Sequence, residues 1–290
     1  MADGRFRGAF LNGTRLVNQM RVQHNLGILE TMILGQAVLC AALLIPTMKG
    51  REHLTFRYDT NGPAAGFSVE ADSTGYVRGF LLQDRIPIEQ PLENWDLSPF
   101  FGDGALTISR IGEGMKAPQV GTVEIMHKNI AKDLAWYFAQ SEQVHTAFNT
   151  SVQFDKNGQV IGAGGMFIQK MPYEGGKSEK SGEFSGMDEE TLIQQVENAF
   201  RAMPSIGKWF SEGGDMEDVI YGLFREFEPQ AVLSREVIFD CPCSTETFVR
   251  HIKNLPKAEL EDILVHDKEP IEVVCHSCGS KYEIYKKMLL

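Results

Sequence analysis

Four of the chain's five cysteines form two close pairs near the C-terminal end. The first pair is Cys241 and Cys243, and 31 residues separate it from the second, Cys275 and Cys278. Two close pairs joined by a loop are the ligand arrangement of a structural zinc site, because each turn of the chain supplies two sulfurs. Four thiolates complete a tetrahedral shell and leave no open position for a substrate. The spacing therefore predicts one Zn²⁺ per chain in a structural or regulatory role, with buried or disulfide-bonded cysteines as the alternative.

The first pair is unusual because only Pro242 separates its two cysteines, and this rigid residue holds the sulfurs close together. If the metal left, each pair would be able to oxidise locally, and thiolates are the form of cysteine that an oxidant attacks. The site is therefore predicted to be a redox switch as well as a structural element. His251, His266 and His276 lie nearby and are alternative ligands, although exposed histidines are the simpler interpretation when four cysteines are available.

The composition is that of an ordinary soluble globular protein, with 43% hydrophobic and 23% charged residues among 290. A net charge of -11 disfavours nucleic acid and anionic membranes as partners. The apolar stretch from Leu26 to Ile45 is interrupted by Glu30 and Gln36, which predicts a buried core helix rather than a membrane span. No signal peptide is evident, and cysteines spaced for a metal fit a reducing cytoplasm. Cys40 lies inside the apolar helix and is expected to be an inert core residue.

The first part of the chain, residues 1–173, alternates strand and helix patterns and predicts an α+β domain with a mostly antiparallel sheet. Strands are expected over 5–11, 54–58, 66–71, 76–82, 104–111, 120–126, 147–154 and 159–169, and helices over 14–25, 26–45 and 130–144. The run Gly162–Gly165 has the appearance of a phosphate loop but precedes a strand-like segment. It is better explained by a bulge or tight packing within a strand.

The middle of the chain, residues 174–231, is predicted to be a flexible connection followed by short amphipathic helices. Its apolar residues are the candidates for binding unfolded proteins: Leu192, Val196, Phe200, Trp209, Phe210, Ile220, Leu223 and Phe224. Helices this short depend on docking their apolar face. They are either ordinary core helices or conditionally folded helices that expose that face on demand. In the second case, if the segment docks partly through the C-terminal module, unfolding of that module would release it.

The C-terminal part, residues 232–290, has too few apolar residues for a substantial core. Ser244 is a predicted cap for a helix to about Asn254, Pro256 begins a second helix, and two short strands flank the second cysteine pair. Domains of this size often need a metal. Structural zinc supplies about 10–16 kcal/mol of apparent binding free energy, whereas a whole domain is stable by only about 5–15 kcal/mol. Loss of zinc is therefore expected to unfold this module.

At these residues the sequence resembles the redox-regulated heat-shock chaperones of the 33 kDa class, and the resemblance extends over nearly the whole chain. It is carried by both cysteine pairs and by four further segments: Tyr137-Phe138 through Ser141-Glu142-Gln143, Ala163-Gly164-Gly165-Met166 through Met171-Pro172, Leu255-Pro256, and Glu261-Asp262-Ile263-Leu264. The resemblance implies an ATP-independent holdase that is inactive with zinc bound and is activated by oxidation during stress. It further implies that oxidised Cys241 pairs with Cys243 and Cys275 with Cys278, that the middle segment unfolds to bind clients, and that the active form is a homodimer.

Two other functions compete with this one. A constitutive zinc-ribbon module for a nucleic-acid or protein partner predicts a basic face near the cysteines, but Lys281, Lys286 and Lys287 are outnumbered there by acidic residues. An enzyme in the N-terminal domain predicts a recognisable motif. The sequence has no nucleophile elbow, zinc-protease motif or phosphate loop, so we expect a non-enzyme.

Overall fold

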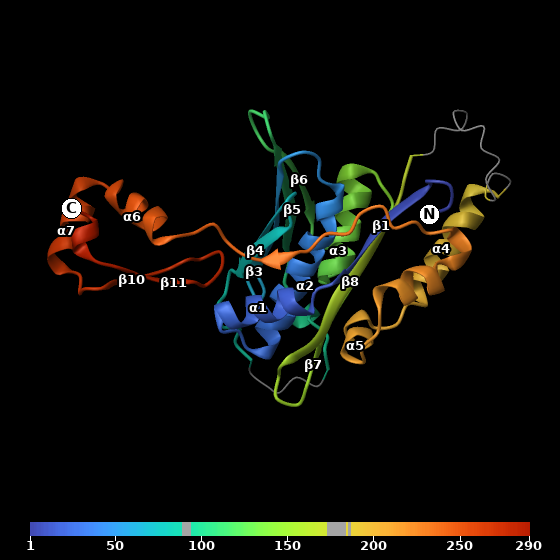
Figure 1. Ribbon diagram of the computed structural model, residues 1–290, viewed down its shortest axis with the longest axis horizontal. Helices are drawn as coiled ribbons and strands as arrows, with labels where there is room; N and C mark the ends of the chain where they lie inside the picture. The colour runs from blue at the N-terminus through green and yellow to red at the C-terminus, as the bar shows by residue number, and fades with distance from the viewer. Residues whose placement is uncertain (89–93, 173–183, 185–186) are drawn as a thin grey trace.

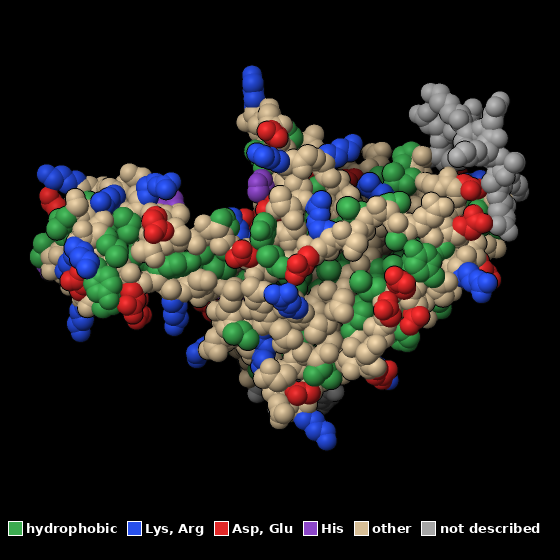
Figure 2. All heavy atoms as spheres, in the orientation of Figure 1, with side chains coloured by type: hydrophobic (Ala, Val, Ile, Leu, Met, Phe, Trp, Pro, Cys, Tyr) green, Lys and Arg blue, Asp and Glu red, His purple; other side chains and the backbone are tan. Residues whose placement is uncertain are grey.

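The computed structural model describes residues 1–88, 94–172, 184 and 187–290. Two sheets and several helices form an N-terminal body, and a small C-terminal module projects from it as a separate lobe (Figures 1 and 2). This arrangement confirms the predicted α+β class. On the visible face of the lobe, basic and acidic side chains are interspersed (Figure 2).

The larger sheet has, among the described residues, six strands in the order β6-β5-β2-β3-β4-β9. They are β2 (Glu52–Thr60), β3 (Gly66–Asp72), β4 (Tyr76–Leu81), β5 (Gly104–Gly112), β6 (Gln119–Glu124) and β9 (Ile238–Phe239). Neighbouring strands are antiparallel except β4 and β9, which are parallel. Leu54, Phe56 and Tyr58 alternate along β2 and are buried, so one face of the sheet covers the core.

The smaller sheet has the order β1-β8-β7, with β1 (Phe6–Asn12), β7 (Thr146–Phe154) and β8 (Val160–Lys170). The glycine run lies inside β8, which confirms the strand interpretation. A Cβ at Gly162 would lie 1.9 Å from the carbonyl oxygen of Gly207, on the helix that packs over this strand. Glycine is needed at this position because the two backbones approach so closely.

Helix α2 (Ile28–Leu44) is the centre of the core, and its side chains are buried on all sides. The stretch Ile28–Thr47 is long and apolar enough to cross a membrane, but 83% of its apolar window is buried inside the protein. It is therefore the predicted core helix. Burial raises the pKa of the Cys40 thiol to about 12, which keeps this thiol neutral and unreactive at neutral pH.

The remaining helices of the body are α1 (Thr14–His24) and α3 (Ile130–Tyr137). The helix predicted over 130–144 is present to Glu142, but its second part, Phe138–Glu142, is a π-helical turn rather than α-helix. Gln143 has a φ of 56° and ends that turn. Short 3₁₀ turns lie at Ile45–Thr47, Ser98–Phe100 and Lys286–Met288.

The middle segment, residues 187–227, contains α4 (Glu189–Arg201), α5 (Ile206–Ser211), a π-helical turn (Asp218–Leu223) and a 3₁₀ turn (Arg225–Phe227). The apolar residues from Met216 to Phe227 have the spacing of one amphipathic helix, but the structure has two short turns there instead. Most of the predicted flexible connection, residues 174–186, lies outside the described residues.

The middle segment packs on the smaller sheet rather than on the C-terminal module (Figure 1). The buried Leu192 and Val196 share a second apolar cluster with Phe6 of β1 and Ile168 of β8. The hypothesis that this segment docks through the C-terminal module is therefore wrong. Phe6 of β1 and Met166 and Ile168 of β8 give this sheet an apolar face on which the helices bury their own apolar side chains.

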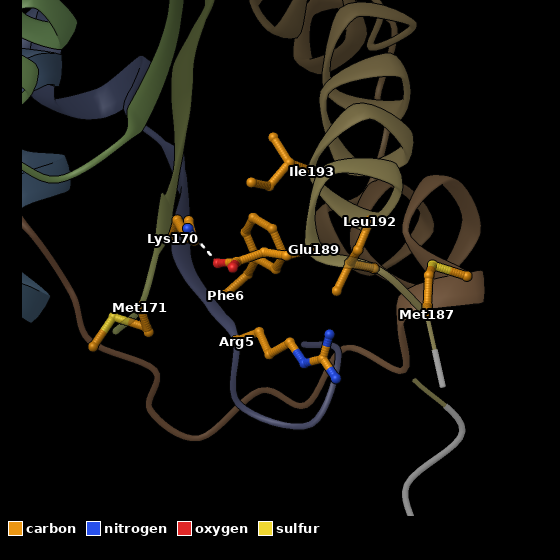
Figure 3. A pocket seen from close by; sticks show the side chains of 8 residues that line it. All are labelled: Arg5, Phe6, Lys170, Met171, Met187, Glu189, Leu192 and Ile193. Atoms are coloured by element: carbon orange, nitrogen blue, oxygen red, sulfur yellow. Dashed lines mark ion pairs between the residues drawn. The ribbon is translucent and has the colours of Figure 1, made fainter. Parts of the chain in front are cut away.

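A hollow of about 230 Å³ remains between the start of α4 and the edge of the smaller sheet (Figure 3). It is lined by Arg5, Phe6, Lys170, Met171, Met187, Glu189, Leu192 and Ile193. An ion pair between Lys170 and Glu189 crosses it. The packing of α4 is thus incomplete at its first turn.

A strap, residues 228–240, crosses the body and ends in β9, after which the C-terminal module begins (Figure 1). The module contains α6 (Thr245–Lys253), α7 (Lys257–His266), β10 (Ile271–Val274) and β11 (Lys281–Ile284). Thr247 N donates to Ser244 Oγ at 3.2 Å, which confirms the predicted helix cap. In α6 and α7, both fully described, no side chain is buried. The module therefore has the thin core that the sequence predicted.

Candidate metal centre

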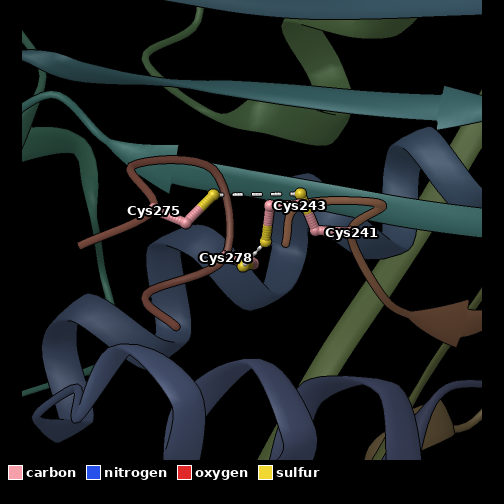
Figure 4. Close-up of side chains that lie close together, drawn as sticks. All are labelled: Cys241, Cys243, Cys275 and Cys278. Carbon is pink, nitrogen blue, oxygen red and sulfur yellow. Dashed lines mark hydrogen bonds between the residues drawn. The ribbon is translucent and has the colours of Figure 1, made fainter. Parts of the chain in front are cut away.

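The four paired cysteines converge at the junction of the C-terminal module and the body (Figure 4). Their Sγ atoms all lie within 4.8 Å of one another. Cys241 and Cys275 approach to 3.8 Å, and Cys243 and Cys278 to 3.5 Å. A tetrahedral zinc ion with bonds of about 2.3 Å would place its sulfurs about 3.8 Å apart. The four thiols are thus grouped as one ion requires.

The cysteines are free thiols, and each of the two short Sγ–Sγ contacts joins a cysteine of the first pair to a cysteine of the second pair. All five cysteines lie in the described ranges, and none of them forms a disulfide. Within the described part of the chain, no histidine joins the cluster. His276 faces the ring of Phe80, with centroids 3.8 Å apart, and His266 Nδ1 lies 2.8 Å from Asp262 Oδ1. A site made of four sulfurs is the arrangement that the geometry favours.

The second cysteine turn has the backbone of a metal-binding knuckle. Gly279 N donates to Cys275 O at 2.7 Å, and Cys275 N donates to Ser280 O at 2.8 Å. Gly279 has the positive φ that its position after the pair predicted, at 73°. A Cβ there would also lie 2.5 Å from the carbonyl oxygen of Gln23 at the end of α1. Glycine therefore shapes the knuckle and lets it approach the body.

Polar groups surround the sulfurs on several sides. Tyr282 Oη lies 3.0 Å from Cys243 Sγ, and Ser280 Oγ lies 3.2 Å from Cys278 Sγ. Arg78 Nη1 donates to Cys241 Sγ at 3.2 Å. Such hydrogen bonds stabilise metal thiolates and orient them. Ser280 and Tyr282 are two residues apart just after the second pair, and in an extended segment this spacing places both side chains on the same side, as a signal that they lie near the sulfurs. Nothing in the sequence connects Arg78 with the cysteines.

The pKa values of the thiols depend on burial and on these neighbours. Burial is the largest cause that raises the pKa of Cys243 and Cys275. At Cys278 burial acts in the same sense, but the hydrogen bonds with Ser280, Cys243 and Cys275 together outweigh it and lower the pKa. Thiols that burial keeps protonated are deprotonated when they coordinate a divalent cation. The site is therefore suited to a cation that supplies the missing positive charge.

Strand β4 of the body lies directly against the metal centre. Gly79 N donates to Ser277 O, inside the second knuckle, at 2.9 Å. Arg78 also pairs with Glu70 of β3, with Nε 2.8 Å from Oε2. Although burial opposes it, the hydrogen bonds to Cys241 and Glu70 raise the pKa of Arg78, so its charge is permanent. Cys275 and Cys278 are 7% and 2% exposed and belong to the main apolar core.

Helices α4 and α5, which carry several of the predicted client-binding residues, lie on the opposite side of the body from the C-terminal module (Figure 1). Seven of the eight belong to the second apolar cluster or pack against it: Leu192, Val196, Phe200, Trp209, Phe210, Leu223 and Phe224. Ile220 is half-buried and lies outside this group. The structure thus brings most of these side chains together and turns them inward, onto the smaller sheet.

The family model described as Hsp33 protein matches residues 1–285. The chain belongs to the Hsp33 family. Hsp33 proteins are chaperones, and this chain is a chaperone of that family.

Curated Hsp33 relatives share about three residues in ten with this chain. The 33 kDa chaperonin of Ruminiclostridium cellulolyticum is 31% identical over 285 residues, which cover 97% of this chain and 91% of the relative. The 33 kDa chaperonin of Thermotoga maritima has the same identity and coverage. The crystal structure of the Hsp33 homologue from Thermotoga maritima matches with a TM-score of 0.83 and 30% identity, covering 100% of this chain and 93% of that one. The fold is therefore that of Hsp33.

Proposed function

We propose that this chaperone is an ATP-independent holdase that zinc keeps inactive and that oxidation activates. The observation that carries the proposal is the group of four free Sγ atoms within 4.8 Å. One Zn²⁺ bound by Cys241, Cys243, Cys275 and Cys278 holds the C-terminal module folded. The proposal keeps the three parts of the chain that the sequence suggested: residues 1–173, residues 174–231 and residues 232–290.

The chemical step is oxidation of the two close pairs. Cys241 joins Cys243 and Cys275 joins Cys278, and each new S–S bond yields two electrons that reduce one molecule of peroxide to two waters. Once oxidised, the four cysteines would offer no thiolate to hold a zinc ion. Because no side chain of the fully described α6 and α7 is buried, the module unfolds once the metal is lost.

The strap is the proposed route from the metal to the middle segment, since these two regions do not pack together. At its start, Ala2 N donates to Phe227 O at 2.7 Å. Near its end, Ile238 N donates to Gly75 O and Asp240 N to Val77 O, both at 3.0 Å. When Cys241 is released, the strap is freed at its metal end. The middle segment then keeps only its own packing on the smaller sheet, which is incomplete at α4 (Figure 3).

The released segment would present Met and aromatic side chains to unfolded client proteins. We further propose that the active form is a homodimer and that the protein acts in the cytoplasm during oxidative stress, without nucleic-acid or membrane partners. Free thiols, a buried apolar helix and a module surface of mixed charge support this assignment (Figure 2).

The test is a peroxide titration of the zinc-loaded protein. Zinc release is followed with a chromogenic chelator, and suppression of aggregation is followed by light scattering of a heat-denatured client. We expect both signals to rise together in the wild type. Cys275→Ser should lose the coupling between them, whereas Cys40→Ser should preserve it as the matched control. Aggregation suppression that is indifferent to oxidation, as expected of a constitutive zinc ribbon, would contradict the proposal.

A further inference from the structure

The outer edge of β4 is covered by two separate pieces of the C-terminal segment. Strand β9 pairs with its first residues, Tyr76 opposite Ile238 and Val77 opposite Phe239. Further along, the N–H of Gly79 donates to the carbonyl of Ser277. Without these two covers, β4 would be the open edge of the larger sheet.

Each of the two covers, strand β9 and the turn at Ser277, is connected directly to one of the cysteine pairs. Strand β9 ends two residues before Cys241, and Ser277 lies between Cys275 and Cys278. Within the described residues no further strand pairs with either cover. Strand β9 is only two residues long, the knuckle is a turn, and both covers rest on α1 through His24 and Gln23. A cation that binds the four sulfurs would therefore hold both covers in place on this edge.

An open β4 edge would offer both backbone groups and an apolar site. The carbonyls of Gly75 and Val77 accept hydrogen bonds from β9, and the N–H of Gly79 donates to the knuckle. Phe239 is fully buried beside the ring of His24, with centroids 5.8 Å apart. An unpaired edge strand is a template for another extended chain, and such pairing reads the backbone rather than the sequence.

We propose that the β4 edge, once uncovered, binds an extended segment of an unfolded polypeptide as an added strand. The inference rests on the proposed function, since it needs the metal to leave. The occupant is argued from β9 itself, which is an extended segment pairing by backbone hydrogen bonds and burying one large apolar side chain. The opposite edge of the sheet, β6, is not controlled in this way, because its Val120 is 61% exposed with the centre assembled.

The first test uses a synthetic peptide of residues 234–240, which copies β9. We expect it to bind the oxidised, zinc-free protein and not the reduced, zinc-bound protein. The N–H groups of Ile238 and Asp240 face β4, whereas those of Val237 and Phe239 alternate away from it. N-methylation at 238 and 240 should weaken binding about tenfold or more, and N-methylation at 237 and 239 should weaken it much less. Equal losses from the two methylated peptides would overturn the proposal.

The second test locates the peptide and a denatured client on the full-length protein. Tyr76 is half-exposed, so Tyr76→p-benzoylphenylalanine places a photo-crosslinker on the β4 edge, and the same change at Val120 is the control on the opposite edge. Oxidation should raise crosslinking of both probes severalfold at position 76 and leave it unchanged at 120. In the unmodified protein, the amide of Gly79 should exchange faster after oxidation and slow again with the peptide bound.

The two proposals fail in different ways, because zinc release and aggregation suppression are measured in the same samples. If oxidation releases zinc and starts suppression while the Gly79 amide stays protected and position 76 captures no probe, the edge proposal is wrong and the proposed function stands. Crosslinks from position 76 only to a second copy of this chain would likewise overturn it, since the edge would then be a dimer contact. If oxidation releases no zinc and starts no suppression, both proposals fall.

Discussion

Arg78 Nη1 lies 3.2 Å from Cys241 Sγ, which brings a charge of the N-terminal body into contact with the first cysteine pair. Glu70 holds the same guanidinium from the other side. A zinc ion with four thiolates carries a net charge of -2, and a fixed cation at this distance offsets part of it. Arg78 is thus a positioning residue that connects the sheet to the metal centre.

Replacing Arg78 by Gln should make the metal easier to extract. Hydrogen bonds to charged groups contribute about 1.5–3 kcal/mol, so we expect zinc transfer to a chelator to be favoured about tenfold or more. The measurement is competition with a chromogenic chelator at fixed pH. Arg57→Gln is the matched control, because Arg57 pairs with Asp59 on the same sheet, far from the sulfurs. Equal effects of the two substitutions would show that Arg78 acts only through general stability.

Replacing Tyr282 by Phe should make the centre more sensitive to peroxide. The lost hydroxyl lies 3.0 Å from Cys243 Sγ, and a thiolate without that hydrogen bond is a stronger nucleophile. The ring contact with Phe248, at 5.1 Å, is kept. We expect zinc release at a given peroxide concentration to become severalfold faster, as followed by stopped-flow absorbance. Tyr285→Phe, which removes an exposed hydroxyl beyond the knuckle, should leave the rate unchanged.

Removing zinc from the reduced protein should unfold the C-terminal module and leave the body intact. The metal supplies about 10–16 kcal/mol, more than a module of this size gains from its own core. Amides of α6 and α7 should lose their protection from hydrogen exchange, while those of α2 remain protected. Readdition of zinc should restore the protection. Retention of slow exchange in α6 and α7 after chelation would show that the module has stability of its own.

Substituting Gly162 by Ala should loosen the middle segment without any oxidation. The added Cβ would lie 1.9 Å from Gly207 O, so α5 has to move off β8. We expect the reduced, zinc-bound variant to be cleaved faster by protease within residues 187–227 and to suppress aggregation in part. Gly222→Ala is the control, because a Cβ there meets nothing within 4 Å. A Gly162→Ala protein that is as protease-resistant and inactive as the wild type would contradict this role of α5.

The sequence was most informative where local pattern and local structure agree. The alternation along β2, the long and mostly apolar run of α2 and the Ser244 cap each depend on neighbouring residues, and each was predicted correctly. The grouping of the four cysteines followed from their spacing in the same way. The π-helical turn after Tyr137 was missed because such a turn has the composition of the helix that it extends.

Long-range packing was harder to predict. The middle segment has an amphipathic pattern, but such a pattern does not indicate which surface the apolar face covers. In the structure that surface is the smaller sheet. The contact of Arg78 with Cys241 joins residues 163 positions apart, and its partners are set by the position of β4 at the edge of the sheet. A single sequence contains no direct signal for such contacts.

Cys275 and Cys278, the more buried of the two cysteine pairs, share the hydrophobic core of the N-terminal body, and Gly279 lets their knuckle lie against the end of α1. Under the proposed function, the rest of the molecule therefore influences how readily these cysteines are oxidised. A fragment of about the last 60 residues would keep all four paired cysteines but would lose the residues of the body that surround them. The oxidant concentration that oxidises the cysteines would therefore differ between this fragment and the full chain. Placing the four cysteines in another protein would transfer the thiols without the surroundings that set their reactivity.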